Sequence, residues 1–89
     1  MTGKRVSAQQ VKVMAVFMVE PQEWFDSNAI GRKTEIPRST VRHFLFTFLR
    51  LGLPDRVEVH GGYLYRLSPR AGTQPYFRRL QEAAAAMKP

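Results

Sequence analysis

Residues 38–43 of this 89-residue chain bring arginine, serine and histidine together at helical spacing. Ser39, Arg42 and His43 project to one side of a helix at about 100° per residue. An arginine guanidinium donates two parallel hydrogen bonds, which match the edge of a guanine or a phosphate group. Serine and histidine side chains add single hydrogen bonds to acceptors of the same kinds. The spacing therefore predicts a helix face that binds a polyanion.

Arg42 lies at the middle of this face and is the candidate for reading a base. Arg38 and Thr40 lie at the expected start of the helix, where side chains and free backbone amides commonly meet phosphate. Phe46 follows one turn after Arg42 and interrupts the polar side. It could touch a thymine methyl group, fill a pocket on a partner protein, or be buried by the last helix of the chain. All three interpretations of Phe46 stay open.

The helix that carries these residues is predicted over residues 37–51. Pro37 has the fixed φ of a first helical turn, and Gly52 is suited to closing the last one. The apolar residues of the segment fall on the side opposite the arginines. This buried side consists of Val41, Phe44, Leu45, Phe48 and Leu51, with Leu49 at its margin.

A first helix is predicted before it, because Ser7 and Gln10 form a capping-box pattern and Pro21 ends the apolar segment that follows. This helix is apolar on more than one face. One stripe consists of Val11, Met14, Ala15 and Met18, and the other of Val13, Val16 and Phe17. The second stripe must pack either on the C-terminal helix or on another copy of the chain, and both alternatives stay open.

Asp26 is a good N-cap for a short second helix, whose buried side is expected to include Ala29 and Ile30. Trp24, just before it, is expected in the core. After the third helix, alternating residues in the segments 56–60 and 63–67 predict two strands, with Gly61 and Gly62 in a two-residue hairpin turn. The residues expected to cover the edge of the core are Val57, Val59, Leu64 and either Tyr63 or Tyr65.

A loop over residues 68–74 leads to a last helix that begins near Pro75. The basic composition, with a net charge of +7 and a pI near 10.6, suits a polyanionic partner. Without cysteine the chain has no disulfides and no thiolate metal ligands, and two histidines are too few for a metal site. The carboxylates are scattered, and no glycine-rich phosphate loop or nucleophile elbow is present. We therefore predict no enzymatic activity, cofactor or metal.

The longest apolar stretch is too short to cross a bilayer, and no secretory signal is evident. We therefore expect a cytoplasmic protein without a membrane partner, associated with the nucleoid when it is bound there. No small-molecule ligand is evident from the sequence.

The segment Thr34-Glu35-Ile36-Pro37-Arg38-Ser39-Thr40-Val41 resembles the turn and the start of the recognition helix in the winged helix-turn-helix domains of bacterial and phage transcription regulators. The family pattern there is threonine, glycine, leucine, serine, arginine, serine, threonine and valine. The chain departs from it at Glu35, where glycine is usual, at Pro37, where serine is usual, and at Gly31, where alanine is common.

The resemblance implies an α+β, mainly helical fold with a three-helix core, a β-hairpin wing and an additional C-terminal helix. It divides the chain into an N-terminal arm (residues 1–6), the winged helix-turn-helix domain (7–68) and a C-terminal helix (69–89) that packs on the domain or forms a dimer contact. It further implies a sequence-specific regulator of transcription, expected to be a repressor. Such a regulator reads the major groove of double-stranded DNA with residues 37–51 and the backbone or minor groove with the wing, residues 56–67.

The residues expected to contact DNA are Arg32, Lys33, Arg38, Ser39, Thr40, Arg42, His43, Phe46, Arg56 and Arg66. A two-fold homodimer would match a palindromic operator. Its interface is expected at Val13, Phe17, Tyr76, Leu80 and Met87. The alternative to a DNA-binding regulator is a winged-helix module that binds other proteins in a replication, partition or conjugation assembly.

Overall fold

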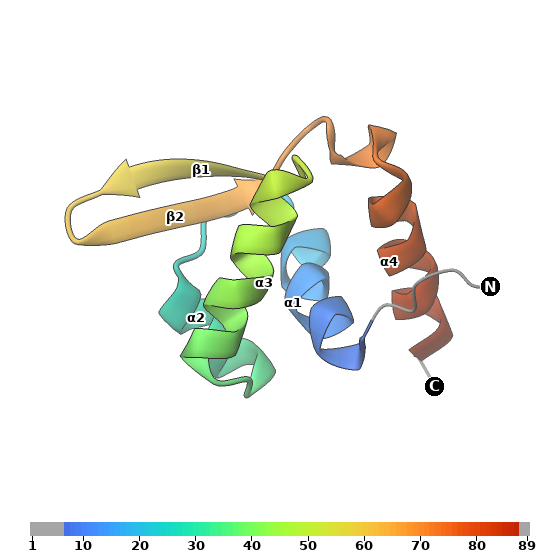
Figure 1. Cartoon of the computed structure of the whole chain (residues 1–89), viewed down its shortest axis with the longest axis horizontal. Helices are drawn as coiled ribbons and strands as arrows, with labels where there is room; N and C mark the ends of the chain where they lie inside the picture. Colours follow the sequence, from blue (N-terminus) through green and yellow to red (C-terminus); the bar gives the residue numbers. More distant parts are fainter. Residues whose placement is uncertain (1–6, 88–89) are drawn as a thin grey trace.

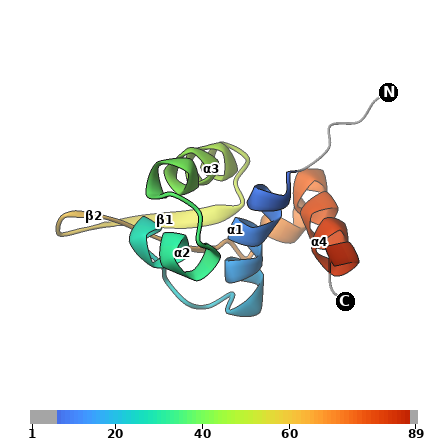
Figure 2. The ribbon, with the colours of Figure 1, turned by 90° about the horizontal axis from the view of Figure 1, so that it is seen from below.

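The computed structural model describes residues 7–87, and it shows helices packed around a central α1 with a two-stranded hairpin projecting from one end (Figure 1). Both views place α4 at the end of the molecule opposite the hairpin tip (Figure 2). The expected N-terminal arm and the side chain of Met87 lie outside the described residues. The elements are α1 (Ala8–Val19), α2 (Ser27–Thr34), α3 (Arg38–Arg50), β1 (Pro54–Val59), β2 (Gly62–Leu67), a 3₁₀ turn (Ala71–Thr73) and α4 (Pro75–Met87).

The N-terminus of α1 has the predicted capping box. The Ser7 hydroxyl accepts from the Gln10 amide at 3.1 Å, and the Ser7 amide donates to Gln10 Oε1 at 3.2 Å. Both apolar stripes of α1 are used within the chain, since Val13 and Phe17 are fully buried together with Met14. The helix contacts α2, α3, α4 and β2. The second stripe therefore packs inside one chain, which decides between the two alternatives left by the sequence.

The turn between α2 and α3 is tight because its backbone adopts a left-handed conformation at Glu35, with φ 60° and ψ 31°. Asp26 caps the start of α2, where its carboxylate accepts from the Ala29 amide at 2.7 Å. Gly31 faces the turn so closely that a Cβ there would lie 3.2 Å from the carbonyl oxygen of Ile36. The glycine at this position therefore allows the turn to lie close against α2.

Helix α3 begins after Pro37 and ends in a Schellman motif. The Leu53 amide donates to the Phe48 carbonyl at 3.1 Å, and the Gly52 amide donates to the Leu49 carbonyl at 3.0 Å. Gly52 has a φ of +74°, as its predicted role requires. The buried side of α3 is fixed by Val41, Leu45 and Phe48, with Phe44 and Leu51 partly buried.

Strands β1 and β2 pair antiparallel, with Val59 opposite Gly62. The two-residue turn is therefore His60-Gly61, one position earlier than predicted, and Gly61 supplies the positive φ of +88°. Val57 and Val59 are 41% and 39% exposed, so the expectation that they cover the core was wrong. The hairpin extends beyond the helices toward its tip, so its outer part has no core to cover (Figure 1).

The base of the wing is fastened to the segment between α1 and α2. Phe25 and Tyr65 exchange two backbone hydrogen bonds of 2.8 Å, and the Phe25 ring is buried. The neighbouring Trp24 is only half-buried, which corrects the prediction that it lies in the core. Its ring is covered by the Arg66 guanidinium, 4.4 Å from the ring centroid, and Arg66 also lies 3.9 Å from the Asp55 carboxylate.

Helix α4 packs on α1. Leu80 is fully buried, and the Tyr76 hydroxyl donates to Gln10 Oε1 at 2.9 Å, the same atom that accepts from the Ser7 amide. Burial raises the pKa of the Tyr76 phenol, and the nearby Arg79 and the hydrogen bond to Gln10 partly offset this. Across the described range 7–87, no helix is both long and apolar enough to cross a membrane.

The expected dimer interface is corrected by this packing. Val13, Phe17 and Leu80 are fully buried inside a single chain, and a second chain cannot reach them while this fold is intact. The amphipathic pattern that suggested an interface is satisfied by α1 packing against the other elements. Tyr76 is partly exposed beside α1, and the side chain of Met87 lies outside the described residues.

The left-handed backbone at Glu35 leads to a prediction about stability. A residue with a Cβ is disfavoured in this conformation by about 1–2 kcal/mol, whereas glycine adopts it freely but is more flexible in the unfolded chain. We expect Glu35→Gly to raise the free energy of unfolding by up to about 1 kcal/mol, which corresponds to a melting temperature higher by about 4–8 °C. Thermal unfolding measures the shift, with Glu35→Ala as the control that removes the charge and keeps the Cβ. A melting temperature for Glu35→Gly below that of Glu35→Ala would contradict the strain.

The cover on Trp24 leads to a second prediction. Trp24 is the single tryptophan of the chain, so its fluorescence reports on the base of the wing. We expect Arg66→Ala to shift the emission maximum to longer wavelength, because the ring loses its cover and gains contact with water. Arg56→Ala is the matched control, since Arg56 stacks on Tyr63 instead and should leave the Trp24 emission unchanged. An equal shift of the emission maximum in both variants would contradict the contact between Arg66 and Trp24 as its cause.

Candidate nucleic-acid interface

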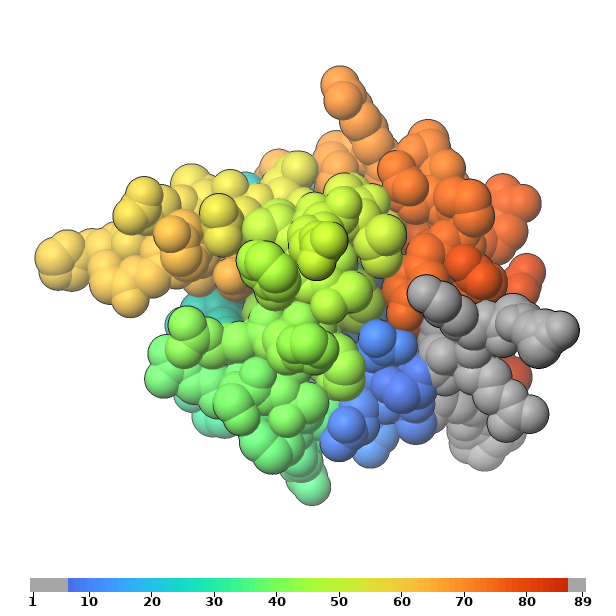
Figure 3. All heavy atoms as spheres, in the orientation of Figure 1, coloured from blue at the N-terminus to red at the C-terminus, as the bar shows by residue number. Residues whose placement is uncertain are grey.

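A groove of about 600 Å³ lies between α3 and the hairpin. Figure 3 shows α3 exposed on the face turned to the viewer, with the hairpin projecting beside it. The described residues that line the groove include three arginines and no acidic residue. They are Ser27, Arg38, Ser39, Arg42, His43, Phe46, Leu49, Arg56, Gly61, Gly62, Tyr63 and Tyr65. Its electrostatic character is therefore that of an anion-binding surface.

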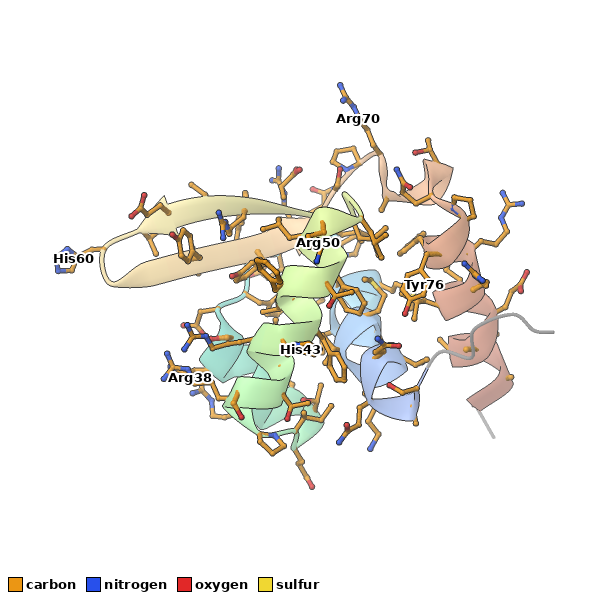
Figure 4. The ribbon with its side chains drawn as sticks, in the orientation of Figure 1. Arg38, His43, Arg50, His60, Arg70 and Tyr76 are labelled. Carbon is orange, nitrogen blue, oxygen red and sulfur yellow. The ribbon has the colours of Figure 1, made fainter. Side chains whose placement is uncertain are left out.

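Helix α3 supplies the charged side of the groove. Arg38, Ser39, Arg42 and His43 are all exposed, because the apolar side of the same helix is held in the core. Figure 4 shows Arg38 extending from the start of α3 on the side of the hairpin. The predicted polar face of residues 38–43 is therefore present and lies open to solvent.

The start of α3 adds backbone donors to these side chains. Pro37 occupies the N-cap and makes no side-chain cap hydrogen bond. The first amides of a helix have no acceptor within the helix, and they carry the positive end of its dipole. A phosphate placed beside Arg38 and Ser39 could accept from these amides as well as from the side chains.

The hairpin supplies the opposite wall. Arg56 is exposed and lies 4.2 Å from the centroid of the Tyr63 ring, a distance typical of a cation–π contact. The contact places the guanidinium against the aromatic ring of the wall. His60 lies at the tip of the hairpin, far from the helices (Figure 4).

Strand register separates the two arginines of the wing. Arg56 pairs with Tyr65, whereas Arg66 pairs with Asp55, so their side chains project from opposite faces of the hairpin. Only Arg56 lines the groove. Arg66 is held against Trp24 and Asp55 on the other face, which argues against the expected DNA contact and gives it a role in positioning the wing.

Three other predicted contacts do not line the groove. Arg32 and Lys33 are exposed on α2, and Lys33 instead borders a hollow between α1 and α2 that also includes Lys12 and Val16. Thr40 is half-buried on α3. With Arg66, four of the ten predicted DNA contacts therefore lie outside the groove. The groove brings together the other six, which are Arg38, Ser39, Arg42, His43, Phe46 and Arg56.

Phe46 is 60% exposed in this groove. The interpretation that the last helix buries it was wrong, because α4 packs on α1. The Arg50 guanidinium lies 6.0 Å from the Phe46 ring centroid. The two remaining interpretations, a thymine contact and a protein contact, both require the exposure that the structure gives this ring.

The sequence analysis missed the aromatic lining of the hairpin as part of the site. Tyr63 and Tyr65 lie on the same face of the hairpin as Arg56, and both line the groove. The sequence analysis predicted only that one of these two tyrosines covers the edge of the core. The alternation of side chains along a strand places both tyrosines on the face of Arg56 with either two-residue turn, so the sequence carried this signal.

The structure is similar to solved structures of transcriptional regulators. The PcaV transcriptional regulator from Streptomyces coelicolor, solved in complex with its natural ligand, matches with a TM-score of 0.69 and 27% identity, over 98% of this chain and 61% of that one. A possible transcriptional regulator from Methanosarcina mazei matches with a TM-score of 0.65 and 19% identity, over 91% of this chain and 72% of that one. A MarR family protein from Bacillus stearothermophilus matches with a TM-score of 0.65 and 16% identity, over 93% of this chain and 56% of that one.

The chain thus spans between 56% and 72% of the length of these three structures. No protein-family model and no curated protein match the sequence. The element order of the chain is three helices, a two-stranded hairpin and a further helix. The chain is a winged helix-turn-helix domain, of the type found in transcriptional regulators.

Proposed function

We propose that the chain is a sequence-specific, double-stranded DNA-binding regulator of transcription. The observation that carries this proposal is the groove between α3 and the hairpin. Arg38, Arg42 and Arg56 all line it, and the described residues that line it include no aspartate or glutamate. A surface of this kind attracts phosphates through charge and can distinguish bases through arginine hydrogen bonds. The net charge of +7 favours the same partner.

In the proposed complex, α3 enters the major groove and the hairpin follows the flanking backbone or minor groove. Arg42, exposed near the middle of α3, donates to the O6 and N7 atoms of a guanine. Arg38, Ser39 and the first amides of α3 bind phosphate, and Arg56 binds the backbone beside the wing. Arg32 and Lys33 are exposed on α2 outside the groove, and the proposal includes them as further phosphate contacts.

We further propose that the protein acts as a repressor. Repression needs only that a bound protein occupies an operator overlapping a promoter, and the groove supplies what such binding requires. The PcaV regulator, to which this structure is similar, was solved in complex with its natural ligand, and that ligand is a property of PcaV. The proposal for this chain assigns no effector to it.

A homodimer is also part of the proposal. One α3 contacts only a few base pairs, so two copies related by a two-fold axis would double the contacts and match a palindromic site. The interface cannot use the buried residues Val13, Phe17 and Leu80. It must be built from surface residues outside the groove, because the groove has to remain free for DNA.

The test begins with duplexes recovered from a randomised pool by repeated binding to the purified chain. Fluorescence anisotropy then measures their affinity at several salt concentrations. We expect Arg42→Ala to weaken binding to the recovered duplex by about 5- to 150-fold, the range for loss of a bidentate base contact. Binding to an unselected duplex should change much less, because there Arg42 contributes only charge.

Arg70→Ala is the matched control, because it removes the same charge from an exposed loop residue that points away from the body of the molecule (Figure 4). Equal losses for Arg42→Ala and Arg70→Ala would contradict the assigned interface. Failure of the pool to yield any preferred duplex would contradict sequence-specific binding. The stoichiometry of the same titration counts chains per duplex, and one chain per duplex at saturation would contradict the homodimer.

A further inference from the structure

The exposed ring of Phe46 is unusual in its surroundings. It is 60% exposed on a helix face that otherwise carries arginine, serine and histidine. Arg42 lies one turn before it and Arg50 one turn after it, with the Arg50 guanidinium 6.0 Å from its ring centroid. With 60% of its surface open, the ring is not buried by the described part of the chain, so packing within that part does not explain an apolar side chain among cations.

The groove restricts what can cover this ring. A protein partner that buried Phe46 with an apolar pocket would also have to bury Arg42 and Arg50, which is costly unless each charge is paired. The major-groove edge of DNA has no such conflict, because the phosphates lie beside the bases and can pair with the arginines. It also carries one apolar group that phenylalanine contacts, the 5-methyl group of thymine.

Resting on the proposed function, we propose that Phe46 reads a thymine methyl group and thereby sets one position of the DNA sequence that the protein prefers. Arg42 and Phe46 are four residues apart, which is about 6 Å along the axis of α3. Successive bases of one strand are about 3.4 Å apart. The preferred site therefore contains a thymine about two base pairs from the guanine that Arg42 reads.

The experiment uses the duplex recovered from the randomised pool and replaces each thymine in turn with uracil, which lacks only the methyl group. The wild-type chain should lose about fourfold in affinity at one thymine near the guanine, the factor expected for one methyl group removed from contact. Phe46→Ala should bind the thymine and uracil duplexes equally. Its overall affinity is not the readout, because the comparison is between two duplexes for one variant.

Val19→Ala is the matched control, because Val19 is 78% exposed on α1 and borders the hollow between α1 and α2 instead of the groove. It should keep the wild-type preference for thymine. Circular dichroism establishes that both variants keep the fold, which the exposure of both side chains leads us to expect.

Several outcomes would overturn the inference. The first is a recovered site that has no thymine near the guanine. The second is a wild-type chain whose affinity does not change with any uracil replacement. The third is a uracil replacement that lowers the affinity of Phe46→Ala and of the wild type by the same factor. If Phe46→Ala retains both affinity and thymine preference, the ring does not meet DNA and a protein contact is favoured. Absence of any preferred duplex would instead overturn the proposed function itself, so the two failures are distinct.

Discussion

Burial of α1 on two sides determines how the rest of the chain is arranged. Val13, Met14 and Phe17 are fully buried, and α1 contacts α2, α3, α4 and β2. Because this one helix supplies the centre of the core, α3 needs only one apolar side to pack and can leave the other to solvent. The Schellman motif at Gly52 then ends α3 and directs the chain into the hairpin, which lies beside that free side. The groove is thus a consequence of how the core is packed.

The sequence predicted the helices well, because each has a local signal at its ends. Ser7, Asp26 and Gly52 occupy the capping positions that their side chains or φ angles favour. The hairpin turn was misplaced because Gly61 and Gly62 both tolerate positive φ, and only the pairing of Val59 with Gly62 distinguishes them. The buried stripe of α1 was ambiguous for a different reason. Periodicity shows that an apolar face must be covered, but it cannot show whether the same chain or a second one covers it.

The candidate site also contains residues that the sequence could predict and residues that it could not. Residues on α3 were predicted correctly as exposed because helical periodicity assigns a face, and the core fixes which face is free. Strand alternation places Arg56 and Arg66 on opposite faces of the wing, but only the structure shows that the face of Arg56 turns to the groove and that of Arg66 to Trp24. Phe46 could not be resolved from sequence, since its environment is set by where α4 packs. The left-handed residue Glu35 shows that a family glycine can be replaced where the surrounding turn holds the backbone in place.

The account depends most on the groove between α3 and the hairpin being the surface that meets DNA. The most direct test is a titration of the ¹⁵N-labelled chain with its selected duplex, following each backbone amide by nuclear magnetic resonance. The account predicts that the largest shifts occur at the start of α3 and along the hairpin, while amides of α4 change little. Largest shifts on α4 and the outer side of α1, with α3 unchanged, would contradict it.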